Sequence, residues 1–79
     1  MLIYVLQSLK HGRFYIGSTN DLNDRLKRHN FRKNKSTRDG VPWKLVHVEK
    51  FNTRSEAVKR EIQIKKYKGG NAFKKLIKL

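Results

Sequence analysis

Residues 2–18 read LIYVLQSLKHGRFYIGS, and this stretch decides the fold. Apolar side chains alternate between two faces from Leu2 to Leu6, which is typical of a short strand. The segment 8–13 is polar and contains a glycine, so it predicts a hairpin loop, and residues 14–18 predict the return strand. Gly17 lies near the end of that strand, where a glycine indicates a close backbone approach or a β-bulge. The chain therefore begins with a predicted hairpin.

Helix signals and a further strand follow the hairpin. Thr19, Asn20 and Asp21 supply helix-start chemistry, and the pattern predicts a helix over about 21–31. The segment 30–42 is polar and rich in Lys, Arg, Asn and Ser, which predicts a mobile basic loop. Residues 43–51 contain Leu and Val residues and predict a third strand.

The last part of the chain is predicted to be helical. Residues 53–56, TRSE, match a capping box, in which each end residue satisfies the other's backbone donor. The helix that they open runs to about residue 67 or 68, where the glycine pair 69–70 ends it, and Asn71 can cap a final short helix. The order β-β-α-β-α-α predicts a small α/β domain of the α+β type. A three-stranded, mostly antiparallel sheet flanked by helices would form a single domain over residues 1–79.

Composition restricts the class of partner. The 79 residues include 20 Lys+Arg and 6 Asp+Glu, which gives a formal net charge of +14. The chain has no cysteine, which excludes a disulfide scaffold and a thiolate zinc site and is compatible with a reducing compartment, so we expect a cytoplasmic protein. No apolar run approaches the roughly 20 residues that span a bilayer, and we see no signal peptide. The charge favours nucleic acid over an anionic membrane surface as the partner.

Two basic residues border the core-facing side of the first predicted helix. At about 100° per residue, Leu22 and Leu26 define an apolar stripe, and Arg25 and His29 lie along one margin of it. A guanidinium there offers a planar fork for phosphate oxygens. The competing interpretation is structural, with an arginine that snorkels and a histidine whose tip reaches solvent.

A carboxylate falls inside the apolar stripe of the second predicted helix. Glu61 shares this stripe with Ala57 and Ile64. Its desolvation costs several kcal/mol unless it is paired or binds a metal. Lys65 offers a structural partner four residues later. The functional interpretation is that Glu61 holds one hard divalent cation, whose other ligands are water and phosphate.

Tyr4 and Tyr15 lie on the two strands of the predicted hairpin. Across a non-hydrogen-bonded pair, we expect their side chains to be close neighbours on one face. The competing interpretation is that they fill a core edge and keep wet hydroxyls. Together with Arg25 and Glu61, they would assemble a polar site suited to phosphodiester hydrolysis, where a tyrosine or His29 handles the proton. We expect a positive site and a metal ion to lower the tyrosine pKa from its usual value of about 10.

These residues resemble a known pattern. The matching segments are Ile3-Tyr4-Val5, Tyr15-Ile16-Gly17-Ser18-Thr19, Asp21-Leu22, Arg25-Leu26, His29-Asn30, Ser55-Glu56-Ala57, Glu61 and Ile64-Lys65-Lys66. They resemble the GIY-YIG nuclease superfamily, above all its small single-domain bacterial members, over nearly the whole chain. Leu2 stands where the family name has Gly, but the neighbouring tyrosine is kept.

The resemblance implies a set of catalytic roles. Tyr15 would activate or orient the attacking water, assisted by Tyr4 and His29. Arg25 would stabilise the phosphorane. Glu61 would be the only protein ligand of one Mg²⁺ or Mn²⁺ ion.

The resemblance also implies supporting residues. Gly17 would be structural and would let the backbone pass close to the site. Many family members carry an asparagine beyond the glutamate; Asn71 is the candidate here, although helix capping is the favoured interpretation. DNA would be held by phosphate contacts that position it without reading its sequence. The candidates for these contacts are Lys27, Arg28, Arg32, Lys33, Lys35, Lys65, Lys66 and Lys68.

Three functional hypotheses follow from the sequence. The first is a metal-dependent DNA endonuclease, or nuclease-like protein, that acts as a monomer in DNA repair or recombination, on a particular DNA structure or non-specifically. The second is a non-catalytic basic module that binds nucleic acid through charge. The third is an adaptor for a protein partner, which would use Trp43 and the 30–42 loop, although Trp43 also fits core or strand-edge packing.

Overall fold

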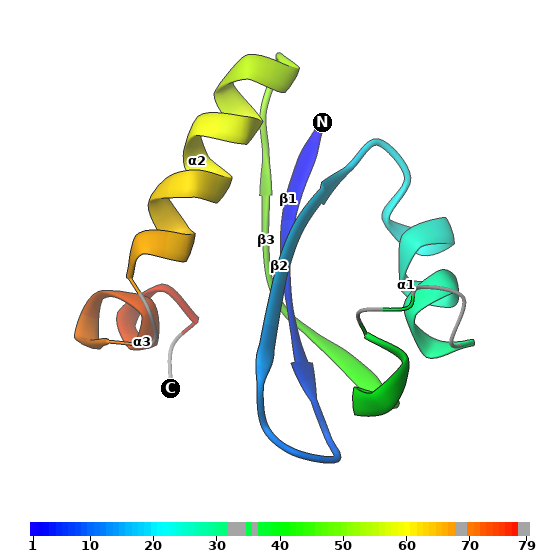
Figure 1. Cartoon of the computed structure of the whole chain (residues 1–79). Coiled ribbons are helices and arrows are strands. Elements are labelled where there is room, and N and C mark those ends of the chain that lie inside the picture. The colour runs from blue at the N-terminus through cyan, green and yellow to red at the C-terminus, as the bar shows by residue number, and fades with distance from the viewer. Residues whose placement is uncertain (32–34, 36, 68–69, 78–79) are drawn as a thin grey trace.

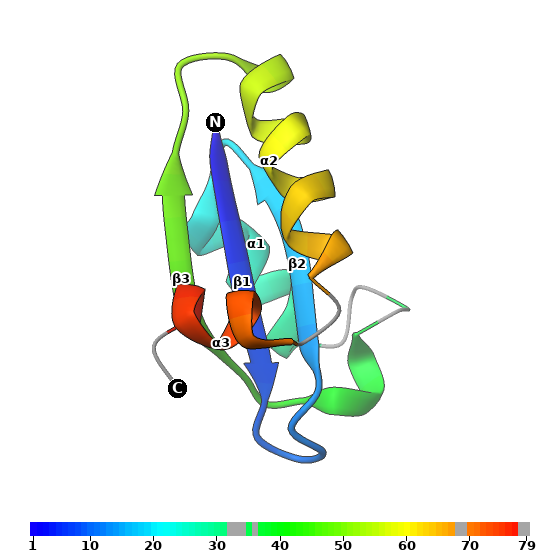
Figure 2. The ribbon, with the colours of Figure 1, turned by 90° about the vertical axis from the view of Figure 1, so that its left-hand side faces the viewer.

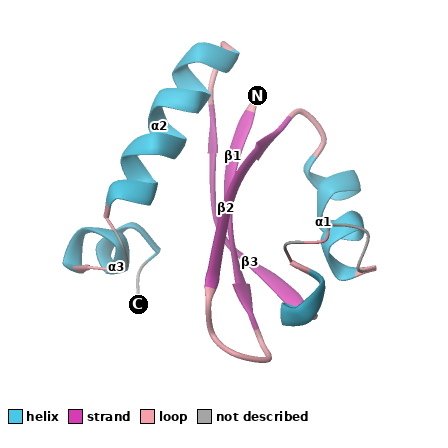
Figure 3. Ribbon diagram, in the orientation of Figure 1, coloured by secondary structure: helices cyan, strands magenta, loops and turns pink. Residues whose placement is uncertain are grey.

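The computed structural model describes residues 1–31, 35, 37–67 and 70–77 (Figure 1). The elements are β1 (Leu2–Ser8), β2 (Phe14–Thr19), α1 (Leu22–Asn30), the 3₁₀ turn η1 (Arg38–Gly40), β3 (Trp43–Lys50), α2 (Arg54–Lys66) and α3 (Asn71–Ile77). Figure 3 shows the same arrangement coloured by element type. The predicted β-β-α-β-α-α order and the α+β class are therefore confirmed.

The sheet has three strands in the order β2-β1-β3, and both pairings are antiparallel. The first strand, β1, is thus central, and β2 and β3 are the edges. Tyr4 pairs with Gly17 on β2 and with Val48 on β3. A register shift between Val5 and Leu6 interrupts the pairing of β1 with β3.

Helices cover both faces of the sheet. One face carries α1, and the other carries α2 and α3, as two views at right angles show (Figures 1 and 2). The central strand is buried on both sides: Ile3 and Val5 pack in the cluster on the α2–α3 side, whereas Tyr4 and Leu6 pack in the cluster on the α1 side. Alternation along one apolar strand therefore serves two cores.

The structure confirms the predicted starts of α1 and α2. The Asp21 side chain caps α1 by accepting a hydrogen bond from the Asp24 N–H at 3.0 Å. Thr53 caps α2 by accepting one from the Glu56 N–H at 3.2 Å. The predicted end of α2 at about residue 67 or 68 agrees with the structure, in which Lys66 is the last helical residue and Tyr67 is the C-cap. Residues 68 and 69, which include the first glycine of the predicted stop, lie outside the described residues.

The expected mobile loop over residues 30–42 needs correction for residues 37–40, whereas residues 32–34 and 36 lie outside the described residues. Thr37 and Gly40 are buried, and Arg38–Gly40 form a turn of 3₁₀ helix. Ser8 donates a hydrogen bond from its hydroxyl to the Gly40 carbonyl at 2.6 Å. This part of the loop therefore belongs to the core on the α1 side, which polarity alone does not reveal.

A bidentate ion pair attaches α2 to the edge strand β3. Arg60 donates from Nε to Glu49 Oε1 at 2.8 Å and from Nη2 to Oε2 at 3.1 Å. The Arg60 hydrogen bonds lower the pKa of Glu49, and His47, which lies 2.7 Å from the same carboxylate, adds to this effect. The next residue along the helix, Glu61, then faces the opposite edge of the sheet, at β2.

Candidate active site

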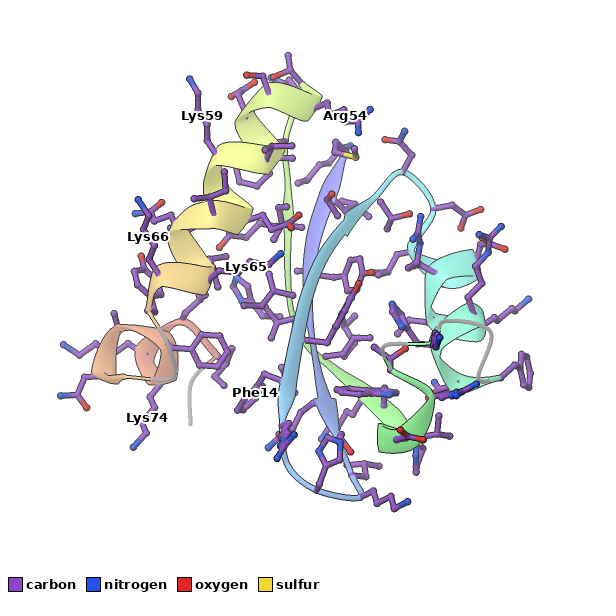
Figure 4. The ribbon with its side chains drawn as sticks, in the orientation of Figure 1. Phe14, Arg54, Lys59, Lys65, Lys66 and Lys74 are labelled. Carbon is purple, nitrogen blue, oxygen red and sulfur yellow. The ribbon has the colours of Figure 1, made fainter. Side chains whose placement is uncertain are left out.

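A cavity of about 440 Å³ opens beside β2 and is bordered by β1, α1 and α2. The residues that line it are Tyr4, Phe14, Tyr15, Ile16, Gly17, Ser18, Arg25, Glu61 and Lys65. Lys65 lies on the side of α2 that faces the sheet, whereas Lys59 and Lys66 point away from it (Figure 4). The cavity thus brings together two tyrosines, an arginine and a glutamate that are far apart in the sequence.

Gly17 makes room for Tyr4. The two residues pair directly across β1 and β2, and a Cβ atom added at position 17 would lie 2.5 Å from Tyr4 Oη. Any side chain at this position would displace the phenol. The prediction of a close approach at Gly17 is therefore confirmed, and the irregularity in the sheet lies between β1 and β3 instead.

A chain of buried hydrogen bonds runs inward from Tyr4. Its hydroxyl lies 3.0 Å from His29 Nε2, and His29 Nδ1 lies 2.7 Å from Thr37 Oγ1. All three residues are at most 1% exposed. The alternative of a histidine with a solvent-exposed tip is therefore wrong, because His29 is fixed at both ring nitrogens.

The burial of this chain controls its protonation. Burial raises the pKa of Tyr4 well above its usual value of about 10, the neighbouring Tyr15 adds to the rise, and Arg25 opposes it. Burial, and then the charge of Arg25, lower the pKa of His29. At neutral pH, Tyr4 therefore keeps its proton and His29 is uncharged. The expected lowering of a tyrosine pKa by positive charge is present at Tyr4 as the effect of Arg25, but burial outweighs it.

Tyr15 is the more accessible of the two phenols. It is half-buried, and its ring centroid lies 6.3 Å from that of Tyr4 and 4.8 Å from that of His29. The prediction that the two tyrosines are close neighbours on one face is confirmed. They are diagonal neighbours, however, because Tyr4 pairs with Gly17 and Tyr15 pairs with Leu6.

Arg25 lines the cavity with an unsatisfied donor. Its Nε is buried and has no hydrogen-bond partner among the described residues. A buried donor without a partner costs about 1–3 kcal/mol, and an anion that accepts from it removes this cost. A phosphate oxygen matches the guanidinium in charge and geometry.

Glu61 is half-buried and pairs with Lys65. The Lys65 Nζ lies 2.7 Å from Glu61 Oε2, and the glutamate side chain is 21% exposed. The structural partner considered from the sequence is thus present. In the described part of the chain, no three His, Cys, Asp or Glu side chains cluster as metal ligands. A hard carboxylate oxygen still fits a Mg²⁺ ion whose other ligands are water and phosphate, and Lys65 would have to release Glu61.

The predicted DNA contacts lie on both sides of the molecule. Arg28 pairs with Asp24 at 3.0 Å, and both side chains are more than half exposed. The exposed candidates are Lys27, Arg28, Lys35, Lys65 and Lys66, whereas Arg32, Lys33 and Lys68 lie outside the described residues. Asn71 is exposed at the first residue of α3 and does not line the cavity. No helix in the described part is long and apolar enough to cross a membrane.

The support that the loop before β3 gives to His29 escaped sequence reasoning. Thr37 supports His29, although nothing in its polar surroundings singled it out. Trp43 is only 7% exposed, and its indole Nε1 donates to the Thr37 carbonyl at 2.7 Å. The proposal that Trp43 offers a surface to a protein partner is therefore wrong, and its packing interpretation is confirmed.

Comparison with known proteins finds a matching family model and several similar proteins. The family model described as the GIY-YIG catalytic domain matches residues 1–74. A UPF0213 protein of Bacillus licheniformis is 45% identical over 64 residues, which cover 80% of this chain and 65% of the relative. A UPF0213 protein of Haloquadratum walsbyi is 46% identical over 54 residues, which cover 67% of this chain and 61% of the relative. A UPF0213 protein of Staphylococcus epidermidis is 39% identical over 66 residues, which cover 82% of this chain and 79% of the relative.

The chain therefore spans slightly less than two thirds of the length of the Bacillus and Haloquadratum relatives. No solved structure matches the chain significantly.

Proposed function

The chain belongs to the GIY-YIG nuclease family, and on that premise we propose that it is a DNA endonuclease that depends on one Mg²⁺ or Mn²⁺ ion. It would hydrolyse phosphodiester bonds in the cytoplasm, during DNA repair or recombination. One observation carries the proposal: a single cavity unites the phenol of Tyr15, the guanidinium of Arg25 and the carboxylate of Glu61. The net charge of +14 supports a polyanionic substrate.

Arg25 is the phosphate-binding group in this proposal. Its buried Nε has no partner among the described residues, so the scissile phosphate would satisfy it. The developing charge of the pentavalent phosphorane strengthens this contact, because a guanidinium that lines the cavity stabilises the added negative charge. Lys65 adds a second positive charge at the cavity wall.

The tyrosines and His29 are the proton-handling groups. Tyr15 is the accessible phenol and would orient or activate the water. Thr37 would donate to His29 Nδ1, and Nε2–H would donate to Tyr4 Oη, across the observed distances of 2.7 Å and 3.0 Å. Tyr4 would then direct its own proton toward the cavity and hold an oxygen of the reacting phosphate.

Glu61 is the residue that would hold the metal ion. Its carboxylate lines the cavity, and the Arg60–Glu49 pair fixes the helix that carries it. When bound, the ion supplies Lewis-acid polarisation of the phosphate and a lower pKa for bound water. Lys65 would exchange its bond to Glu61 for one to the phosphate backbone of the DNA.

Cleavage of end-labelled DNA tests this proposal. Duplex, single-stranded and branched substrates are incubated with Mg²⁺ or Mn²⁺ at low and moderate salt. We expect Arg25→Ala and Glu61→Gln to lower the cleavage rate by about 100-fold or more. Arg54→Ala and Glu56→Gln change exposed residues of α2 outside the cavity and serve as matched controls. Equal rates for all variants would refute the assigned site.

One observation favours a second function, a non-catalytic module that binds nucleic acid. The 2.7 Å pair between Lys65 and Glu61 neutralises the only carboxylate among the described residues of the cavity wall. Such a module predicts steeply salt-dependent binding and intact DNA with every divalent ion. The same experiment therefore separates the two functions.

A further inference from the structure

A second hollow lies on the outer face of α1, away from the sheet. It has a volume of about 410 Å³ and is lined by Asp24, Lys27, Arg28 and Phe31. None of these residues lines the cavity of the candidate active site. The hollow therefore needs an explanation of its own.

Phe31 is an aromatic ring that the fold leaves in solvent. It is 70% exposed, more than any other large apolar side chain in the described part of the chain. Its backbone N–H closes the end of α1 by donating to the Lys27 carbonyl at 2.8 Å, but this bond does not involve the ring. The side chain thus has no evident task in holding the helix.

The surroundings of the ring are basic. Lys27 and Arg28 are exposed beside it. The pair between Arg28 and Asp24 has both side chains more than half exposed, at 57% and 53%. Such exposed pairs contribute little free energy, so Arg28 can exchange Asp24 for a phosphate.

We propose that this hollow binds one unpaired nucleotide of the DNA substrate. Its base would stack on the Phe31 ring, and its flanking phosphates would contact Lys27 and Arg28. Base–aromatic stacking beside positive side chains is how proteins hold single strands without reading their sequence. The inference rests on the proposed function, because the same helix presents Arg25 to the scissile phosphate.

The position of the hollow suits this role. Phe31 follows Arg25 by six residues, which corresponds to about 9 Å along the helix axis. Around that axis the two positions differ by about 120°, so a strand that leaves the cavity must pass around α1 to reach the hollow, a path open to a flexible single strand. In a duplex, the base faces are covered by their neighbours, so the ring selects a single strand, a flap or a bulge.

The charged surroundings of the ring favour a nucleic acid over a protein as the occupant. A stable protein interface buries about 800 Å² on each partner around an apolar centre, whereas a single ring here stands among charged side chains. The positive surface of the chain matches a polyanion. An anionic membrane would match the charge as well, and the test below includes it.

Binding without cleavage tests the inference. Fluorescence anisotropy is measured in EDTA with labelled oligothymidylate of about 15 nucleotides, in the length range that small single-strand-binding folds cover. An abasic strand of the same length and a duplex are the other probes. The variants are Phe31→Ala, Phe31→Tyr and Lys27→Ala, and Leu9→Ala is the control because Leu9 is 63% exposed but lies outside the hollow.

We expect Phe31→Ala to weaken oligothymidylate binding about fivefold or more. Binding of the abasic strand and the duplex should change less than about twofold, because neither offers a base face. Phe31→Tyr and Leu9→Ala should match the wild type, and Lys27→Ala should weaken all three probes alike. Asp24→Asn, which removes the negative charge of the hollow, should tighten all three.

Specific outcomes overturn the inference. It fails if Phe31→Ala changes all probes equally or none of them, or if Phe31→Ala instead abolishes binding to vesicles that contain phosphatidylserine. Failure here leaves the endonuclease proposal intact if DNA is still cleaved. Conversely, a protein that binds through Phe31 but cleaves nothing refutes only the endonuclease proposal.

Discussion

The two faces of the sheet differ in what they bury. Among the described residues, the buried side chains on the face under α2 and α3 are apolar, and they include Ile3, Val5 and Ile64. The face under α1 packs Tyr4 and also buries His29 and Thr37 completely or nearly so. A single strand, β1, supplies side chains to both. The same backbone therefore supports an apolar core on one side and, on the other, an apolar core that also holds a polar network.

The difference between the two faces shows where so small a chain can place polar functional groups. Burying polar groups costs free energy unless each one is hydrogen-bonded. The α2–α3 face provides the apolar burial that stabilises the fold, and this allows the α1 face to keep a phenol, an imidazole and a guanidinium near one cavity. We therefore expect substitutions on the two faces to affect stability and chemistry differently.

The largest effect on stability is expected on the apolar face. Ile64 is fully buried, so Ile64→Ala should lower the free energy of unfolding by about 2–5 kcal/mol, and Ile64→Val by about 0.5–1.5 kcal/mol. Urea denaturation followed by circular dichroism measures both. Losses below 0.5 kcal/mol for both variants would show that this face is not the main core.

The polar face should respond to the loss of a single hydroxyl. Thr37→Val keeps the size of the side chain but leaves Nδ1 of the buried His29 without this partner, which should cost about 1–3 kcal/mol. Thr37→Ser keeps the hydroxyl and should retain most of the stability. If both variants unfold at the same urea concentration, the hydroxyl does not support His29.

The pH dependence of stability should report on His29. Its pKa is lowered in the folded protein, so below about pH 6.5 the unfolded chain binds a proton that the folded chain excludes. Stability should therefore fall as pH decreases from about 6.5 toward the folded pKa, by at most about 1.4 kcal/mol per pH unit.

Urea titrations between about pH 5 and 7.5 measure this slope around the reference pKa of histidine. His29→Gln should flatten it, whereas His47→Gln, at the other edge of the sheet, serves as the comparison. Stability is also lost when Glu49 becomes protonated, but because the pKa of Glu49 is lowered, this loss occurs at a lower pH than the one linked to His29. An unchanged slope in His29→Gln would contradict the assignment.

The smallest effect is expected at the mouth of the cavity. Lys65 pairs with Glu61 in an i, i+4 arrangement, and the lysine side chain is 55% exposed. Lys65→Ala should therefore change the free energy of unfolding by only about 0.3–0.5 kcal/mol. The same variant should reach half-maximal cleavage at a lower metal concentration, because Glu61 no longer has a competing cation. A higher metal requirement would contradict the role of Glu61.

Local patterns were enough to predict the fold. The hairpin, the caps at Asp21 and Thr53 and the strand at residues 43–50 each depend on a few neighbouring residues, and each is present. The grouping of Tyr4 with Arg25 was predictable from facing periodicities together with the family resemblance. These signals come from residues that are close together in the chain, so they can be recognised in a single sequence.

Features that depend on distant contacts were not predictable. The bond of Thr37 to His29 arises only when the loop folds back over α1, and the polarity of the loop hides this. The raised pKa of Tyr4 follows from its depth under the helix, which no sequence pattern gives. Likewise, the pairing of Arg60 with Glu49 requires the register between α2 and β3.

The most direct test of the central claim removes one oxygen atom from the cavity. Tyr15→Phe keeps the ring, and the Tyr4–His29–Thr37 chain does not involve its hydroxyl. With Mg²⁺ or Mn²⁺ and labelled DNA, we predict that single-turnover cleavage falls by about 100-fold or more, while folding and DNA binding stay at wild-type levels. Cleavage by Tyr15→Phe at the wild-type rate would contradict the proposal that this cavity is the catalytic site.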